Sequence, residues 1–197
     1  MSATAELSLS EVLSLRCSTR QFSETPLPFE TVHSLIQIAQ GKRGPSGGRA
    51  APSAHALYPI RLIATCGNVE GTETGTYTID PMTGHTELHC QKDLRKELRQ
   101  AALSNQPWIE TAPLILTFYV NSNEIRQAFA EQPPFGSRGE RYAYIEAGCI
   151  AQNLALYAAE ASIGSVLVAG FDDKETSTAH GVDMQPLLHM CFGIASR

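Results

Sequence analysis

The residues best suited to chemistry form a short basic cluster near the N-terminus, Arg16-Cys17-Ser18-Thr19-Arg20. Two guanidinium groups here flank two hydroxyl side chains just after a predicted helix. The planar fork of arginine matches the oxygens of a phosphate, and hydroxyl and backbone N–H groups can supply further donors. The cluster therefore indicates a multidentate anion site. The alternative is that Arg16 and Arg20 are solvated charges favoured by the C-terminal end of the helix dipole.

A second segment of interest is Pro52-Ser53-Ala54-His55-Ala56-Leu57-Tyr58-Pro59, which ends a long irregular stretch and precedes a predicted buried strand. Irregular stretches of that length are usually functional or disordered. The small residues and prolines would let the backbone lie flat against a planar ligand ring. His55 and Tyr58 are side chains in this segment that could accept a proton.

Polar residues and a glycine also interrupt apolar elements closer to the C-terminus. Glu146, Gln152 and Asn153 lie on an otherwise apolar predicted helix. Buried polar groups need hydrogen-bond partners, so we expect all three to be bonded. Gly170 ends a predicted strand, where the absence of a side chain permits close approach of a ligand.

The sequence does not predict several common kinds of catalytic or binding site. The sequence has no G-x-G-x-x-G fingerprint, and its glycine-rich run at residues 44–48 lacks the strand before it and the helix after it that a phosphate loop or a nucleophile elbow requires. His85 and His89 would lie about 13 Å apart on an extended strand, too far to share a metal ion. The five scattered cysteines form no C-x-x-C pair, which favours reduced thiols. We expect no metal site.

Length and composition predict a single domain over residues 1–197. The chain is 43% hydrophobic and 18% charged, which is ordinary for a globular protein. A net charge of −5 argues against nucleic-acid binding by bulk electrostatics. The first ten residues do not resemble a signal peptide, and no stretch approaches the ~20 apolar residues that span a bilayer. We therefore expect a soluble, cytoplasmic protein with no nucleic-acid or membrane partner.

Periodicity predicts the elements that must position these residues. The predicted helices are Leu9–Arg16, Phe29–Gln40, Asp93–Leu103 and Gly139–Ala161. The last is apolar nearly all round, so it should be central or lie at a subunit interface. The predicted strands are Ile60–Cys66, a hairpin over residues 75–90, Leu114–Val120, Val166–Phe171 and Leu187–Ile194. No repeat or linker divides the chain, and the pattern indicates one α+β domain.

Five strings occur in order along the chain. They are R-x-S-x-R from Arg16, P-S-A-x-A-L-Y-P from Pro52, R-G-x-R-Y from Arg138, E-A-G-x-x-A-Q-N-L from Glu146 and G-F-D-D from Gly170. This ordered set resembles the nitroreductase-like flavoproteins, and most closely their SagB-type branch, which oxidises peptide azolines to azoles. The resemblance implies an intertwined FMN-binding homodimer. It also implies a sandwich with a mostly antiparallel central sheet, flanking helices and the cofactor at the subunit interface.

The resemblance also implies a set of cofactor contacts. They are Arg16, Cys17, Ser18, Arg20, Pro52, Ser53, Ala54, Ala169, Gly170 and Arg197. The first four correspond to contacts with the FMN phosphate and ribityl chain, and Arg20 also to the pyrimidine edge, where a positive charge would stabilise reduced flavin. The next three correspond to a segment that the second subunit lays beside the flavin ring. Ala169 and Gly170 face the ring from the first subunit, and Arg197 is a candidate second phosphate ligand.

One position departs from the azoline dehydrogenase pattern. That branch keeps a Lys-Tyr pair ahead of R-G-x-R-Y to handle the azoline proton, whereas the aligned residues here are Pro134 and Phe135, which cannot accept a proton. We therefore favour an enzyme in which bound FMN passes electrons from NADH or NADPH to a small nitro- or quinone-like acceptor, a scheme that needs no protein nucleophile. The alternatives are azoline dehydrogenation with His55 or Tyr58 as the base, and a low-turnover flavin-binding protein.

Overall fold

A six-stranded sheet forms the centre of the computed structural model, which describes residues 7–43, 47–80, 82–135 and 137–196. The strand order is β5-β4-β3-β6-β8-β7, and every neighbouring pair is antiparallel. The strands are β3 (Arg61–Cys66), β4 (Gly75–Ile79), β5 (Thr86–Cys90), β6 (Leu114–Val120), β7 (Gly164–Val168) and β8 (Gln185–Gly193). The expected α+β class with a mostly antiparallel sheet is confirmed.

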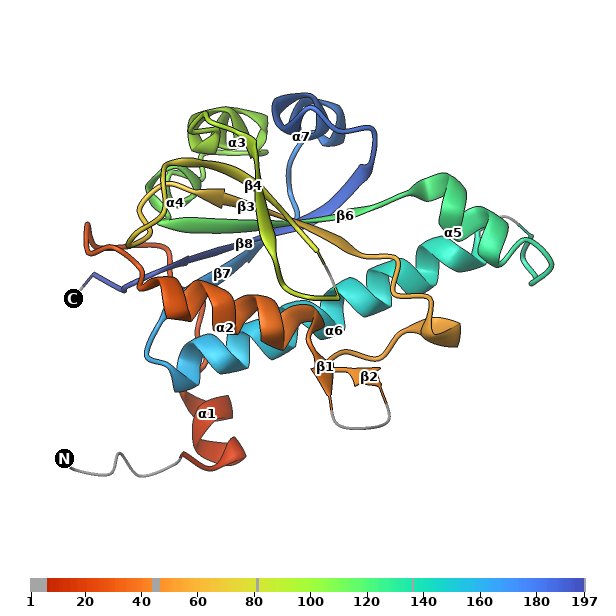
Figure 1. Cartoon of the computed structure of the whole chain (residues 1–197), viewed down its shortest axis with the longest axis horizontal. Helices are drawn as coiled ribbons and strands as arrows, with labels where there is room; N and C mark the ends of the chain where they lie inside the picture. Colours follow the sequence, from red (N-terminus) through yellow and green to blue (C-terminus); the bar gives the residue numbers. More distant parts are fainter. Residues whose placement is uncertain (1–6, 44–46, 81, 136, 197) are drawn as a thin grey trace.

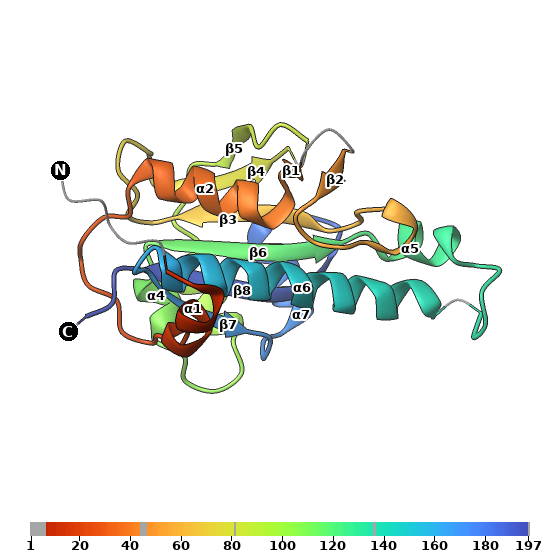
Figure 2. The same cartoon turned by 90° about the horizontal axis from the view of Figure 1, so that it is seen from below.

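Helices cover both faces of the sheet (Figure 1, Figure 2). One face carries α1 (Leu9–Leu15), α2 (Phe29–Gln40) and the long α6 (Arg138–Glu160). The other carries α3 (Arg95–Ala101), α4 (Trp108–Thr111) and α7 (Asp173–His180). The short α5 (Ser122–Ala128) follows β6 and packs against α6. Within the described ranges, no helix has the length and apolar character needed to cross a membrane.

Strand β6 lies between two hydrophobic cores. All seven of its residues are buried, because both faces of the sheet are covered. Leu116 and Phe118 point into the larger core, which α2 and α6 close. Ile115 points the other way, into a smaller core beneath α3 and α4. The sheet therefore carries α6 on one face, and α3 and α4 on the other.

The end of α1 directs the basic cluster toward the sheet. Ser8 begins the helix with a capping box, in which its backbone N–H donates to Glu11 Oε2 at 2.7 Å. Arg16 leaves the helical conformation with ψ of 117°. The chain then runs extended beside β7, where Ser18 forms an isolated bridge with Ser165. The cluster is thus tied to the edge of the sheet.

Three differences from the predicted elements bear on the candidate site residues or their surroundings. Helices α4, α5 and α7 were not predicted, because they are short and α7 buries only Thr176 and His180. The irregular stretch before Pro59 contains two-residue strands, β1 (Lys42–Arg43) and β2 (Gly48–Arg49), and the turn η1 (Ala54–Ala56). Strand β7 ends at Val168 rather than Phe171, so Ala169 and Gly170 lie beyond it.

Two histidines are buried between the sheet and the α3, α4 and α7 layer. His180 Nε2 lies 3.0 Å from Thr65 Oγ1, and His180 Nδ1 lies 2.7 Å from the Tyr119 hydroxyl. His189 Nδ1 lies 2.9 Å from Thr117 Oγ1. Burial lowers the pKa of His180 to about 4 and that of His189 to about 3. The folded protein therefore keeps both imidazoles neutral over most of the acid range.

We predict that the free energy of unfolding falls as the pH drops below about 6.5, the ordinary pKa of histidine. The unfolded chain binds protons at both histidines from that pH downward, whereas the folded chain does so only near their lowered pKa values. Above about pH 6.5 the two histidines are neutral in both states and cause no loss of stability. Between pH 7.5 and pH 5.5 the free energy of unfolding should fall by about 2–3 kcal/mol. Urea denaturation at one protein concentration measures this loss. His180→Gln should show a smaller pH dependence, and equal unfolding free energies of the wild-type protein at both pH values would contradict the prediction.

Candidate functional site

The basic cluster, α6 and β7 enclose a small surface hollow of about 130 Å³. The residues lining it are Arg16, Ser18, Gly148, Ala151, Gln152, Ala155, Ser165, Val166, Leu167 and Met190. Thr19 holds the cluster in place, because its backbone N–H donates to the Ser165 carbonyl at 2.8 Å. The hollow therefore combines a guanidinium, two hydroxyls and an amide, the donor set expected of an anion site.

Two glycines give the hollow its shape. A Cβ added at Gly164 would lie 2.6 Å from the Thr19 side chain, so only glycine lets the cluster approach β7 this closely. A Cβ added at Gly148 would meet no atom within 4 Å. A side chain at Gly148 would therefore project into the open space of the hollow. This is a cradle that a bound group can occupy, and it fits the phosphate end of a nucleotide-like cofactor.

Arg20 lies apart from the hollow, against α4. Its guanidinium carbon is 5.4 Å from the centre of the Trp108 ring, within cation–π range. The loop before α4 also reaches the residues after β7, where Gln106 Nε2 donates to the Gly170 carbonyl at 3.2 Å and the Leu103 N–H donates to it at 2.8 Å. No periodic pattern in the sequence predicted this loop. The available signal was that Trp108 is the only tryptophan of the chain.

A turn of strained backbone follows Ser53. His55, Ala56 and Tyr58 have φ values of 53°, 54° and 50°, and such left-handed conformations cost non-glycine residues on the order of 1 kcal/mol or more each. The Tyr58 N–H donates to Ser53 Oγ at 2.8 Å, and the Tyr58 carbonyl accepts from Arg61 Nη1 at 3.0 Å. Backbone strain persists only where neighbouring groups fix it. The shape of this turn is therefore set by its contacts.

Helix α6 supplies the contacts beneath this turn. Asn153 Nδ2 donates to the Ala50 carbonyl at 3.3 Å. Glu146, on the same helix, is only 4% exposed. Burial raises the pKa of the Glu146 carboxyl, and the Ser53 hydroxyl is the largest influence that opposes this. Of the three polar residues predicted to be bonded on α6, Asn153 is therefore bonded to the segment that leads into this turn.

The residues of α6 divide between two opposite faces. Glu146 and Asn153 are seven residues apart, so at about 100° per residue they share one face. Gly148, Gln152 and Ala155 point the opposite way and line the hollow. Gln152 is exposed, so the prediction that it is a buried, bonded residue is wrong. This face of α6 is open in the single chain, so the expectation that the helix lies at a subunit interface stays a prediction.

A single chain does not bring the two predicted groups of flavin contacts together. Figure 2 shows α1 beside the C-terminal half of α6, whereas the orange η1 turn lies toward its N-terminal half. Arg16 and Ser18 line the hollow beside β7, and Ala169 and Gly170 follow the end of β7. Pro52–Ala54 belong to the segment held by the other face of α6.

The two candidate proton acceptors lie in the strained turn. The exposed His55 packs edge-on against Phe129, with ring centres 5.5 Å apart, and Phe129 packs against Tyr142 at 4.9 Å. The Arg49 guanidinium lies 4.4 Å from the centre of the Tyr58 ring. Neither His55 nor Tyr58 lines the hollow of its own chain.

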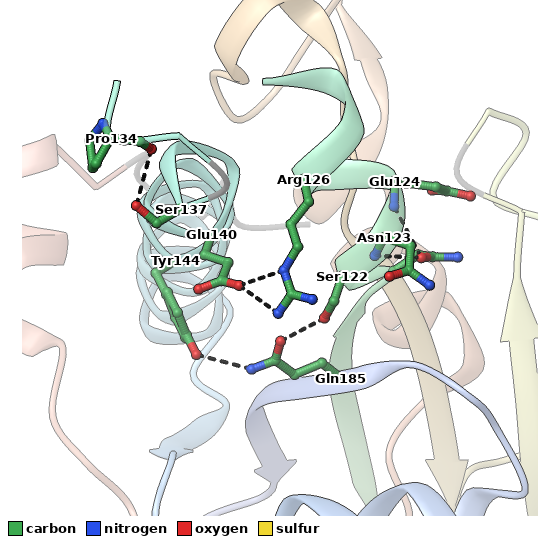
Figure 3. Close-up of polar contacts among 10 residues, drawn as sticks. Ser122, Asn123, Glu124, Arg126, Pro134, Ser137, Glu140, Tyr144 and Gln185 are labelled. Atoms are coloured by element: carbon green, nitrogen blue, oxygen red, sulfur yellow. Dashed lines mark hydrogen bonds and ion pairs between the residues drawn. The ribbon is translucent and has the colours of Figure 1, made fainter. Parts of the chain in front are cut away.

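The start of α6 is fixed by polar contacts to two other elements (Figure 3). Gln185 of β8 accepts a hydrogen bond from Ser122 Oγ at 2.8 Å, and its amide donates to the Tyr144 hydroxyl at 3.2 Å. Arg126 of α5 forms an ion pair with Glu140 at 3.0 Å. These contacts hold α5 and β8 against the first turns of α6.

Other residues singled out in the sequence lie outside both groups. Pro134 and Phe135 are on the exposed turn before α6, where Ser137 Oγ donates to the Pro134 carbonyl at 3.3 Å and Phe135 is 73% exposed. Cys17 is exposed and does not line the hollow. Arg197 lies outside the described residues.

Comparison with known proteins identifies relatives across almost the whole chain. Residues 13–194 match the model of the Nitroreductase family. The protein Putative nitroreductase MJ1384 of Methanocaldococcus jannaschii is 31% identical over 188 residues, covering 95% of this chain and 91% of that protein.

Solved structures share the fold. A putative nitroreductase from Ralstonia eutropha JMP134 is 29% identical with a TM-score of 0.80, covering 100% of this chain and 87% of its own. Two structures below 25% identity show the fold alone. In the E. coli microcin synthetase McbBCD complex, one chain is 21% identical with a TM-score of 0.74, covering 100% of this chain and 76% of its own. The Vibrio harveyi NADPH:FMN oxidoreductase complexed with NAD+ is 19% identical with a TM-score of 0.67, covering 96% and 69%. With its family match spanning nearly every element described above, this chain belongs to the nitroreductase family of oxidoreductases.

Proposed function

We propose that this protein is an FMN-dependent enzyme that transfers electrons from NADH or NADPH to a small nitro- or quinone-like acceptor. The observation that carries the proposal is the hollow where Arg16 and Ser18 converge beside α6 and β7, with Gly148 leaving its centre open. Guanidinium and hydroxyl donors in this arrangement suit a phosphate. The Vibrio harveyi neighbour is an NADPH:FMN oxidoreductase, which supports this choice of cofactors.

The residues around the hollow would each have a distinct task. Arg16 and Ser18 would hold the FMN phosphate, with Arg197 as a further candidate. Arg20, kept beside α4 by Trp108, would lie near the pyrimidine edge and stabilise negative charge there. FMN supplies the hydride chemistry when bound, so the chain needs no nucleophile of its own.

We further propose that a second copy of the chain completes the site. Helix α6 separates the hollow from Pro52–Ala54 within one chain, so these residues would reach the flavin ring of a partner while Ala169 and Gly170 face it from the first subunit. Five large apolar side chains on α1 and α6 are at least half exposed and would be covered in a homodimer: Leu9, Leu13, Leu15, Tyr144 and Ile145. Helix α1 contributes three of these side chains within seven residues, and exposed apolar patches are typical of an interaction surface.

Azoline oxidation is the second candidate. The SagB-type strings and the fold shared with a chain of the microcin synthetase complex favour it. Against it, Pro134 and Phe135 offer no proton acceptor where azoline dehydrogenases keep one. A low-turnover flavin-binding protein is the third candidate, which a measured rate of NADPH oxidation separates from the first.

We predict that the purified protein releases FMN on denaturation and that Gly148→Leu prevents FMN binding without unfolding the protein. The leucine would fill the hollow while meeting no neighbour near its Cβ, and glycine inside a helix is itself destabilising by roughly 0.5–1 kcal/mol. Arg16→Ala should weaken FMN binding by about 2–3 kcal/mol, the loss of a charge-assisted contact. Fluorescence titration with FMN measures both effects.

The matched control for these variants is Arg43→Ala, because Arg43 is an exposed arginine of β1 that does not line the hollow. Its FMN affinity should equal that of the wild-type protein. If both Arg16→Ala and Gly148→Leu bound FMN with wild-type affinity, the hollow would not be the FMN site.

The class of reaction is tested by offering two kinds of substrate to one preparation. NADPH-dependent reduction of menadione or 4-nitrobenzoate should proceed, whereas oxidation of a thiazoline peptide should be negligible, since a missing general base typically costs ~10²–10⁴-fold. Efficient azole formation that disappears in His55→Ala would instead establish azoline dehydrogenation. Bound flavin with no turnover of either substrate would favour the flavin-binding protein.

A further inference from the structure

An indole ring orients one exposed arginine of the basic cluster. The guanidinium carbon of Arg20 lies 5.4 Å from the ring centre of Trp108, the first residue of α4. In the described part of the chain Arg20 forms no ion pair, and a free arginine side chain samples many rotamers. The face of an indole is the best aromatic surface for a cation, so this contact is what can hold the guanidinium in one place.

The indole of Trp108 lacks a hydrogen bond in this position. Its Nε1 atom is buried and has no hydrogen-bond partner among the described residues. Buried indole N–H groups usually find a partner, and leaving one unsatisfied is destabilising. Phenylalanine or leucine could pack against the smaller core without that penalty. What tryptophan adds here is the stronger attraction of its ring face for Arg20.

The backbone fixes the point from which the Arg20 side chain starts. The Thr19 N–H donates to the Ser165 carbonyl of β7 at 2.8 Å, directly before Arg20. Alternate side chains of an extended stretch lie on the same side, so Arg20 follows Arg16 and Ser18 along the side of the hollow. At about 3.3 Å per residue, the Cα atoms of Arg16 and Arg20 are up to ~13 Å apart. Arg20 can therefore reach the far end of a ligand whose phosphate Arg16 holds.

The loop before α4 brings Trp108 to the same end of the proposed site. The Leu103 N–H and the Gln106 side-chain amide donate to the Gly170 carbonyl at 2.8 Å and 3.2 Å. These two hydrogen bonds tie the loop to the residues after β7, for which we propose contact with the flavin ring. Trp108 thus follows a loop that is anchored beside Ala169 and Gly170, at the ring end of the site.

We propose that Trp108 is a positioning residue for the flavin site, which holds Arg20 at the pyrimidine edge and so raises the preference of the site for reduced over oxidised FMN. Reduced FMN carries additional negative charge at that edge, and a cation that is already oriented stabilises it more than a mobile one. This inference rests on the proposed function and extends it, because it assigns the tuning of the cofactor to an aromatic residue that does not line the hollow.

The test uses the fact that Trp108 is the only tryptophan of the chain. Growth on mono-, di- or trifluorinated tryptophan changes this ring alone, and each fluorine withdraws electron density and weakens the attraction for a cation. Trp108→Leu and Trp108→Phe are made in parallel, each in the wild-type and in the Arg20→Ala background. Arg43→Ala is the matched control, because Arg43 is an exposed arginine that lies on β1.

Two measurements follow the contact and its consequence separately. In flavin-free protein, fluorine NMR of monofluorinated Trp108 gives a single resonance, which should shift in Arg20→Ala and stay in place in Arg43→Ala. In the FMN complex, the reduction potential measures the ratio of the affinities for reduced and oxidised FMN. A tenfold fall in this ratio lowers the potential of a two-electron couple by about 30 mV.

The affinity ratio should fall by roughly 10- to 100-fold in Arg20→Ala, the loss of a charge-assisted contact. It should fall by roughly 2- to 10-fold in Trp108→Leu and progressively with each added fluorine, because only the orientation of the cation is lost. Trp108→Phe, which keeps an aromatic face, should lose less than Trp108→Leu. In the Arg20→Ala background no change at Trp108 should have a further effect, because Trp108 acts through Arg20.

The outcomes separate this inference from the proposed function. A wild-type protein that binds no FMN would overturn the proposed function and this inference with it. If the wild-type protein binds FMN, the role of Trp108 alone is refuted by a potential that fluorination leaves unchanged, or by an equal effect of Trp108→Leu in the Arg20→Ala background. A fluorine resonance that ignores Arg20→Ala refutes it as well. Fluorination scarcely alters the volume of the ring, so it decides the matter even if Trp108→Leu fails to fold.

Discussion

Helix α6 packs against its own chain on one face and leaves a hollow on the opposite face, and this separates Arg16 and Ser18 from Pro52–Ala54. Small residues make both faces possible. Ala143 and Ala147 are fully buried on the packed side, and Gly139 passes so close to α5 that a Cβ there would clash with the Ile125 carbonyl. On the open side, Gly148 leaves the hollow unfilled. The helix is thus a thin partition between two surfaces.

This partition explains why one chain cannot complete the proposed site. The basic cluster is fixed to β7 by the Thr19–Ser165 hydrogen bond, and the strained turn is fixed by Ser53 and Arg61 on the far side of α6. Neither group can swing toward the other without breaking buried contacts. A symmetric pair of chains resolves the problem, because two-fold symmetry lets each subunit give one surface and receive the other. In such a pair, the exposed apolar side chains of α1 and α6 would lie in the interface.

The sequence was most informative where a signal is local. The long helix, the buried strands and the basic cluster were all predicted, because apolar period and adjacent charges can be read from neighbouring residues. The nitroreductase family was predicted from strings that are each contiguous, and the match over residues 13–194 confirms it. Contacts between distant segments left no such signal, so the packing of Arg20 on Trp108 was missed, and helical period alone could not show that Gln152 faces solvent while Asn153 does not. The end of β7 was misplaced because the apolar Phe171 continues its pattern, although Phe171 pairs only with Ala102.

The central claim is that each FMN site takes its hollow from one subunit and Pro52–Ala54 from the other, and mixed dimers test it most directly. One subunit would carry Gly148→Leu, which blocks the hollow, and the other Ala54→Trp, which places bulk on the segment offered to the partner. Each variant should be inactive as a homodimer. In a mixed dimer purified by two different tags, a shared site confines both lesions to one site and leaves the second intact, so about half of the wild-type NADPH–menadione activity should return. Mixed dimers as inactive as their parents would show that each site is built within a single chain and would contradict the account.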